Sequence, residues 1–195
     1  MFVRAISLAR QYAERLDSPN HLGDQELASE VILRLRQLHW LYQRIQDLER
    51  QLLAEYERSH GPIGPNHNIV LVYFNRGLPA EASVAFGPQE QVRLLGESFY
   101  QTAHRILVVL DQCQDMLPGL RSIDADGIRR VRNNLIEHAN KKGGHHSYTF
   151  SVSNAAGLRL RTASRPADPE AYLDQGIHIN AREFVSQLEA ALLST

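Results

Sequence analysis

The segment Ile128–His138, with the sequence IRRVRNNLIEH, holds three side chains whose types suit chemistry on phosphate groups. His138 can accept or donate a proton near neutral pH, and such transfer contributes about 10²–10⁴-fold to a rate. Arg132 presents a planar fork of donors that matches phosphate oxygens. Asn133 can orient either group by hydrogen bonding. These three residues form the candidate catalytic set.

Helical geometry predicts how the segment presents these groups. At about 100° per residue, a narrow apolar stripe forms from Ile128, Val131, Leu135 and Ala139. Arg132 and His138 flank this stripe on opposite sides, about 120° apart, so they do not share one face of the helix. This arrangement favours a composite site, in which a second copy of the helix packs on the stripe and brings its own Arg and His.

The order of these residues resembles a family signature, in which an Arg and a polar residue are followed by a His after a gap of four to six residues. Arg132, Asn133 and His138 match it, with five residues between Arg and His. The segment therefore resembles the HEPN superfamily (higher eukaryote and prokaryote nucleotide-binding). The resemblance implies a helical domain, a metal-independent endoribonuclease with a two-fold site, a homodimer, and a toxin or antiviral role with an antitoxin or other protein partner.

Two other pairs in the chain have the same Arg–His spacing, Arg15 with His21 and Arg34 with His39. In both, a leucine follows the Arg instead of a polar residue. Neither pair lies in the basic part of the chain, so we expect both to be coincidental. A structural alternative also exists for the main pair, with Arg132 in a surface salt bridge and His138 near a helix C-terminus, where a cation is favoured.

Positive charge concentrates between residues 121 and 165, where nine Lys and Arg residues face three Asp and Glu residues, giving +6 in a chain of net charge −1. Such asymmetry points to a polyanionic partner, here RNA, although a solvated basic face would look the same. The expected RNA-binding residues are Arg129, Arg130, Lys141, Lys142, Arg159 and Arg161.

Neither a metal nor another cofactor is expected. His138, His145 and His146 match no common zinc spacing. Cys113 is the only cysteine, which excludes an internal disulfide and a cysteine-based metal cage.

Apolar periodicity and turn residues predict the elements that position these groups. Helices are expected over 1–16, 24–59 and 88–117, from near Asp124 or Asp126 to before Gly143, and over 181–193. A strand is expected over 69–74, paired with 82–86. A hairpin is expected from strands over 148–152 and 158–162, joined by the loop SNAAG, and one more short strand is expected within 176–180. The predicted fold is mainly α (α+β), a helical bundle with long antiparallel helices plus a small β-hairpin or sheet. It is one domain over 1–195, with β insertions near 69–86 and 147–180.

The aromatic residues are expected to be structural. Trp40 and Tyr42 lie within the long helix and are predicted to be core or interface residues and not a base-stacking platform. Tyr148 and Phe150 alternate along the first hairpin strand, as in a half-buried strand pair, which is favoured over a base-stacking surface.

Cellular location follows from hydropathy. No apolar run approaches the ~18–20 residues that cross a bilayer, and the N-terminus lacks the apolar region of a signal peptide, so a cytoplasmic location is expected. The expected function is a metal-independent endoribonuclease. The alternative is a non-catalytic helical module that binds a protein partner or a nucleotide.

Overall fold

The structure is a computed structural model, and it shows a mainly helical fold with one small antiparallel sheet, which confirms the predicted fold class. It describes residues 7, 10–11, 22–65, 67, 69–71, 87–111, 123, 125–131, 148–155, 157–162 and 179–193. Of the helix expected over 1–16, only residues 7, 10 and 11 are described, and they are helical.

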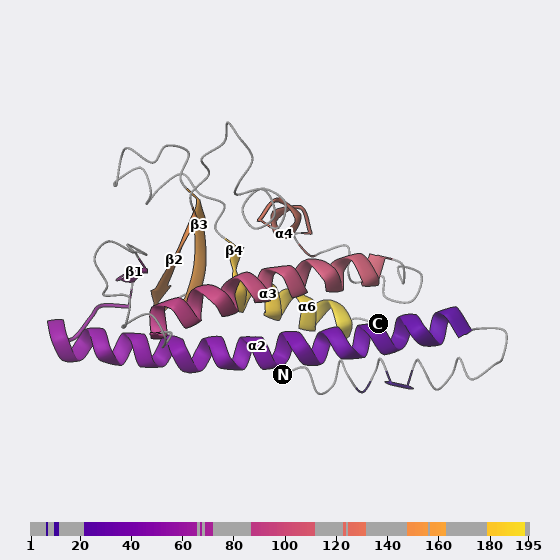
Figure 1. The fold of residues 1–195 in the computed structure, drawn as a ribbon, viewed down its shortest axis with the longest axis horizontal. Coiled ribbons are helices and arrows are strands. Elements are labelled where there is room, and N and C mark those ends of the chain that lie inside the picture. The colour runs from indigo at the N-terminus through magenta and orange to yellow at the C-terminus, as the bar shows by residue number, and fades with distance from the viewer. Residues whose placement is uncertain are drawn as a thin grey trace, which may run out of the picture.

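Two long helices, α2 (Leu22–His60) and α3 (Pro88–Asp111), form the body of the fold. They lie side by side and antiparallel (Figure 1). Both were predicted from apolar residues that recur every three or four positions, although positions 112–117 of the second lie outside the described residues. With 39 residues, α2 is roughly 58 Å long and runs the whole length of the fold.

The end of α2 follows from local sequence. Gly61 adopts a positive φ of 83°, and its amide donates a hydrogen bond of 2.8 Å to the carbonyl of Glu57. Glycine takes this left-handed conformation without the steric penalty of a Cβ, and Pro62 cannot extend the helix.

The core forms where the apolar faces of α2 and α3 meet. Its α2 members are Val31, Leu35, Leu38, Leu41, Tyr42, Ile45, Leu48 and Leu52, and its α3 members are Val92, Phe99, Tyr100, Ala103, Ile106, Val109 and Leu110. The predicted stripes are thus largely confirmed. Trp40 is an exception, because its side chain is 56% exposed and does not belong to the core, whereas the alternative of an interface position stays a prediction.

The sheet contains β1 (Ile69–Leu71), β2 (Tyr148–Ser153), β3 (Gly157–Thr162) and β4 (Ile179–Asn180), in that order and antiparallel throughout. The predicted hairpin is confirmed as β2 and β3. The described partner of β1 is β2, with Ile69 opposite Val152. The partner expected for β1, residues 82–86, lies outside the described residues.

A glycine lets the sheet approach α3 closely. A Cβ at Gly96 would meet the ring of Phe150 at 2.7 Å, so this position of α3 has no room for a larger residue. The buried Phe150 ring also stacks near Tyr100, with centroids 6.4 Å apart. The prediction that Phe150 belongs to a packed strand pair is confirmed.

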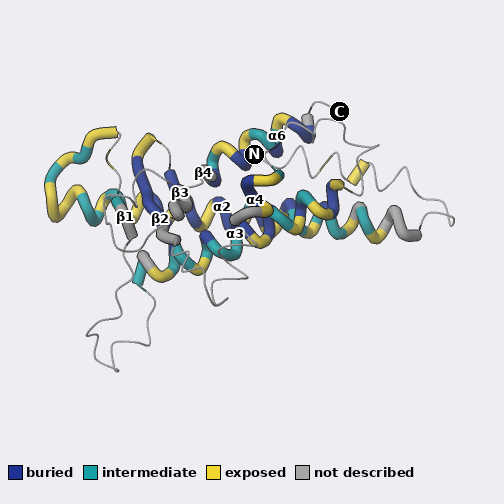
Figure 2. The backbone as a smooth tube through the Cα atoms, turned by 90° about the horizontal axis from the view of Figure 1, so that it is seen from above, coloured by how far each residue is buried: buried dark blue, intermediate teal, exposed yellow. Residues whose placement is uncertain are grey.

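Two shorter helices complete the core. The short helix α4 (Ala125–Val131) packs on α3, and α6 (Ala181–Leu193) packs on β3. Phe184 of α6 meets Phe99 of α3 edge-on, with centroids 6.1 Å apart, so one hydrophobic cluster joins helices and sheet. Burial is highest there, whereas the end of α2 beyond Leu52 is largely exposed (Figure 2). No helix in the described ranges is long and apolar enough to cross a bilayer.

Candidate functional site

Only the start of the candidate catalytic segment is described, as α4. The helix begins after Ile123, which is buried and accepts a hydrogen bond of 2.7 Å from the amide of Ala125. Asp126 lies in the first turn, where a carboxylate interacts favourably with the helix dipole. Gly127 and Ile128 are buried and hold the helix on α3.

Five of the predicted site residues fall beyond this helix. Arg132, Asn133, His138, Lys141 and Lys142 lie outside the described residues, so their predicted roles stay predictions. Arg132 follows directly on Val131, the last residue of α4.

Arg129 is the one predicted RNA-binding residue whose side chain is described. It is 60% exposed, and its Nη1 atom lies 3.1 Å from Oδ1 of Asp126, one turn earlier. An exposed pair of this kind contributes about 0–1 kcal/mol, so a phosphate can compete for the guanidinium at little cost. Arg130 belongs to the same helix, and only its backbone is described.

The burial of Ile128 corrects part of the predicted two-fold site. Its side chain has no exposed surface in the single chain. The sequence places Ile128 first in the apolar stripe on which a second copy was expected to pack. Because α3 packs against α4, this part of the stripe is not available to a partner.

The two hairpin arginines are placed by strand register. Arg159 lies opposite Ser151, and Arg161 lies opposite Thr149. Successive strand residues alternate between the two faces of a sheet, so positions 159 and 161 share one face. The opposite face includes Leu158, which is fully buried.

The fold brings the described parts of the basic region to one side. Figure 1 shows α4, β2 and β3 projecting to the same side of the layer formed by α2 and α3. Arg129 and the strand that includes Arg159 and Arg161 are therefore on the same side of the helical layer, although they are thirty residues apart in sequence.

A buried carboxylate, missed by the sequence analysis, joins α2, β3 and α6. Glu49 is only 6% exposed. Its Oε1 accepts a hydrogen bond of 2.5 Å from the amide of Leu158, and its Oε2 lies 3.6 Å from Nη2 of Arg182. Arg182 also donates to the carbonyl of Ala155, at 3.3 Å, so the pair contacts both the turn of the hairpin and the start of β3.

Burial raises the pKa of Glu49, because removing the carboxylate from water disfavours its charged form. The Leu158 amide and Arg182 act in the opposite direction and compensate only partly. Burial also raises the pKa of the neighbouring Tyr42 hydroxyl, against the effect of Arg182.

Gly157 is required at this junction for two reasons. Its φ is +65°, and a Cβ would lie 2.8 Å from Oε1 of Glu49. A sequence signal for Glu49 does exist, since it falls within the apolar stripe of Ile45, Leu48 and Leu52. Its partner Arg182 could not be predicted, because only the folded chain brings α6 to α2.

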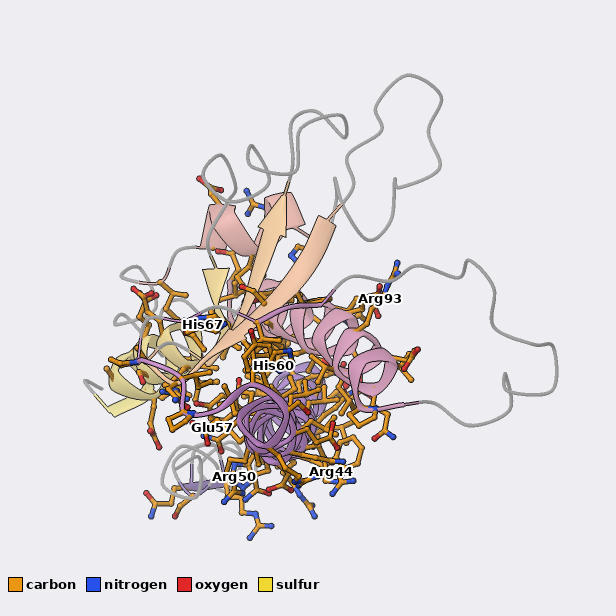
Figure 3. The ribbon with its side chains drawn as sticks, turned by 90° about the vertical axis from the view of Figure 1, so that its left-hand side faces the viewer. Arg44, Arg50, Glu57, His60, His67 and Arg93 are labelled. Atoms are coloured by element: carbon orange, nitrogen blue, oxygen red, sulfur yellow. The ribbon has the colours of Figure 1, made fainter. Side chains whose placement is uncertain are left out.

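A second group that the sequence analysis missed lies at the exposed end of α2. The rings of Tyr56 and His60 stack with centroids 4.2 Å apart, and Nε2 of His67 lies 3.1 Å from the Tyr56 hydroxyl (Figure 3 labels both histidines). The i, i+4 spacing of Tyr56 and His60 could have indicated the stack. Within the described ranges, no group of three or more His, Cys, Asp or Glu residues is arranged to hold a metal ion.

Comparisons with protein-family models, with curated proteins and with solved structures found no match to this chain.

Proposed function

We propose that the chain is a metal-independent endoribonuclease whose catalytic residues are Arg132, Asn133 and His138. The proposal is supported by the placement of α4. This helix is held on α3 through the buried Ile128, its Arg129 is exposed, and Arg132 follows immediately in the chain. A rigid support of this kind is what a catalytic segment needs, since small displacements of reacting groups reduce rates strongly.

The proposed chemistry uses the RNA's own 2′-hydroxyl as the nucleophile. His138 transfers a proton during attack on phosphorus, and Arg132 binds the phosphate oxygens whose charge increases in the transition state. Asn133 orients one of these two side chains by hydrogen bonding. The products are a 2′,3′-cyclic phosphate and a free 5′-hydroxyl. As the family resemblance implies, we further propose a toxin or antiviral defence protein that acts as a homodimer. From the hydropathy of the chain we propose a cytoplasmic location.

An RNA digest in EDTA tests the proposed function. The purified chain should cut RNA without divalent metal and leave 2′,3′-cyclic phosphate ends. DNA of the same sequence should stay intact, because it lacks the 2′-hydroxyl. Cleavage that requires a divalent metal, or that also cuts DNA, would contradict this mechanism.

One observation favours the second candidate, a non-catalytic helical module that binds a protein partner or a nucleotide. Ile128 is covered within the chain, which removes part of the surface expected to complete a two-fold catalytic site. Under this alternative the Arg132–His138 segment is structural, and no RNA cleavage should accompany the purified protein.

A further inference from the structure

The outer face of α2 has a large aromatic residue where solvent-facing helices usually have polar ones. Trp40 is 56% exposed, and Leu33, two turns earlier, is 55% exposed. On a helical wheel Trp40 lies about 160° from Leu38 and Tyr42, the residues that face the core. The ring therefore points away from α3.

Arginines flank Trp40 along the helix. Arg36 and Arg44 lie one turn before and one turn after Trp40, and Arg50 lies further along the same side. Figure 3 shows Arg44 and Arg50 projecting from α2 on the side away from the sheet. We call Leu33, Arg36, Trp40, Arg44, Asp47 and Arg50 the outer stripe.

The outer stripe has a net charge of +2, from three arginines and one aspartate. Asp47 lies 2.5 Å from Arg50 and 3.7 Å from Arg44, so a single carboxylate is shared by two guanidinium groups. Arg36 is exposed and forms no ion pair with any residue that the structure describes. The arginines extend over roughly 21 Å of helix, at 1.5 Å per residue.

This chemistry selects among possible occupants. A partner helix would find one further exposed apolar residue, Leu33, two turns from Trp40. The positions one turn away are Arg36, Gln37, Gln43 and Arg44, so its apolar contact would be small. A second copy of the stripe would bring arginines against arginines. A single-stranded nucleic acid satisfies both features, because its bases stack on aromatic rings and its phosphates pair with cations.

We propose that the outer stripe binds single-stranded nucleic acid, with one base stacked on Trp40 and phosphates bound by Arg36, Arg44 and Arg50. Arg44 and Arg50 of the outer stripe project from α2 on the side away from the sheet. This side of α2 is thus separate from α4, which packs on α3. The proposal goes beyond the proposed function and does not depend on cleavage.

Trp40 is the only tryptophan of the chain, so its fluorescence reports on this face alone. The probe is an oligodeoxythymidylate of about 12 nucleotides, within the range of single-strand site sizes. DNA is used because it isolates binding from ribonuclease activity. Stacking should quench Trp40 emission saturably at low salt. Duplex DNA, whose bases are already stacked, and polyglutamate, which has charge but no bases, should leave the emission nearly unchanged.

Variants separate stacking from charge, with binding followed by anisotropy of a labelled oligonucleotide. Trp40→Ala should weaken binding by about 5- to 150-fold, the loss of one stacked base, and Trp40→Phe should weaken it less. Arg36→Gln should reduce the slope of log affinity against log salt by about 0.7. Arg93→Gln on α3 is the matched control and should change neither quantity. These surface changes should leave the unfolding midpoint unaltered.

Three results would overturn the proposal. The first is an absence of quenching by oligodeoxythymidylate at low salt. The second is equal quenching by polyglutamate, which would show that charge alone acts and that an acidic protein is the better occupant. The third is an emission maximum that shifts to the blue with rising protein concentration before any DNA is added, which would show that a second copy covers Trp40.

Discussion

Glu49 lies in an environment that opposes its charge. It combines burial, a backbone donor and an arginine in one position on α2. Its raised pKa means that desolvation outweighs its two partners. The carboxylate of this ion pair is buried, whereas the Arg182 side chain is 43% exposed. An ion pair with a buried charge can fix one arrangement of elements without adding net stability. Here the arrangement is the docking of the hairpin and α6 on α2.

The raised pKa of Glu49 predicts how the contribution of this residue to the free energy of unfolding changes with pH. Folding favours the protonated form of Glu49, so its contribution is fully present below the unfolded-state pKa of about 4.3 and is lost as pH rises through the folded-state pKa. The free energy of unfolding of the wild type, minus that of Glu49→Gln, should therefore decrease as pH rises above about 4. Urea unfolding of both proteins at a series of pH values measures this difference. A difference that increases with pH would show that Arg182 and the Leu158 amide outweigh burial.

A truncation at the same position tests the hydrogen bond. Glu49→Ala leaves the Leu158 amide without its acceptor, which should cost about 1–3 kcal/mol in the free energy of unfolding. Glu49→Gln keeps an acceptor and should cost less. Equal losses in the two variants would indicate that the hydrogen bond contributes nothing measurable.

At the scale of elements, close contact between α3 and β2 depends on Gly96. Gly96→Ala would place a methyl group against the rigid ring of Phe150, at an overpacking cost of about 1–3 kcal/mol. The higher helix propensity of alanine relative to glycine offsets about 1 kcal/mol of this cost. We expect a net loss of up to about 2 kcal/mol, measured as a lower midpoint of chemical or thermal unfolding.

Gly64 provides the control for this substitution. Nothing lies within 4 Å of a Cβ built there, and its φ is not positive, so Gly64→Ala should be close to neutral. If Gly96→Ala were as harmless as Gly64→Ala, the sheet would have to dock on α3 less closely than the structure shows.

The sequence was informative about helices and much less about partners of strands. Helical periodicity is local, so the stripes of α2, α3 and α6 could be predicted from apolar residues three and four positions apart. The hairpin of β2 and β3 is also local. The pairing of β1 with β2 joins segments almost eighty residues apart, and no local pattern specifies it. The same helical wheel places Trp40 outside the core, so its exposure was predictable from the stripe.

In the candidate site, too, the features that depend on local sequence were predictable and those that depend on tertiary packing were not. Arg129 and the register of Arg159 and Arg161 follow from local elements. The junction of Glu49 and Arg182 depends on tertiary packing, which sequence spacing does not encode. The burial of Ile128 likewise reflects α3, which lies outside the segment that predicted an open apolar stripe.

At the scale of the whole molecule, the proposed two-fold site requires a homodimer. Because Ile128 is already covered, the interface must involve other residues than the start of the predicted stripe. Light scattering at micromolar concentration should give twice the monomer mass of 22.1 kDa. A monomer under these conditions would remove the composite site and require one chain to supply every catalytic group.

The central claim is that His138 transfers protons during RNA cleavage, and a comparison of the wild type with His138→Ala tests it most directly. In EDTA, the variant should cleave RNA about 10²-fold more slowly or worse, the usual loss of a general acid or base. RNA affinity should persist, because the arginines supply most of the attraction to phosphate. His21→Ala and His39→Ala are the matched controls and should retain activity. Equal trace cleavage by the wild type and His138→Ala would contradict the account, since the activity would then not belong to this residue.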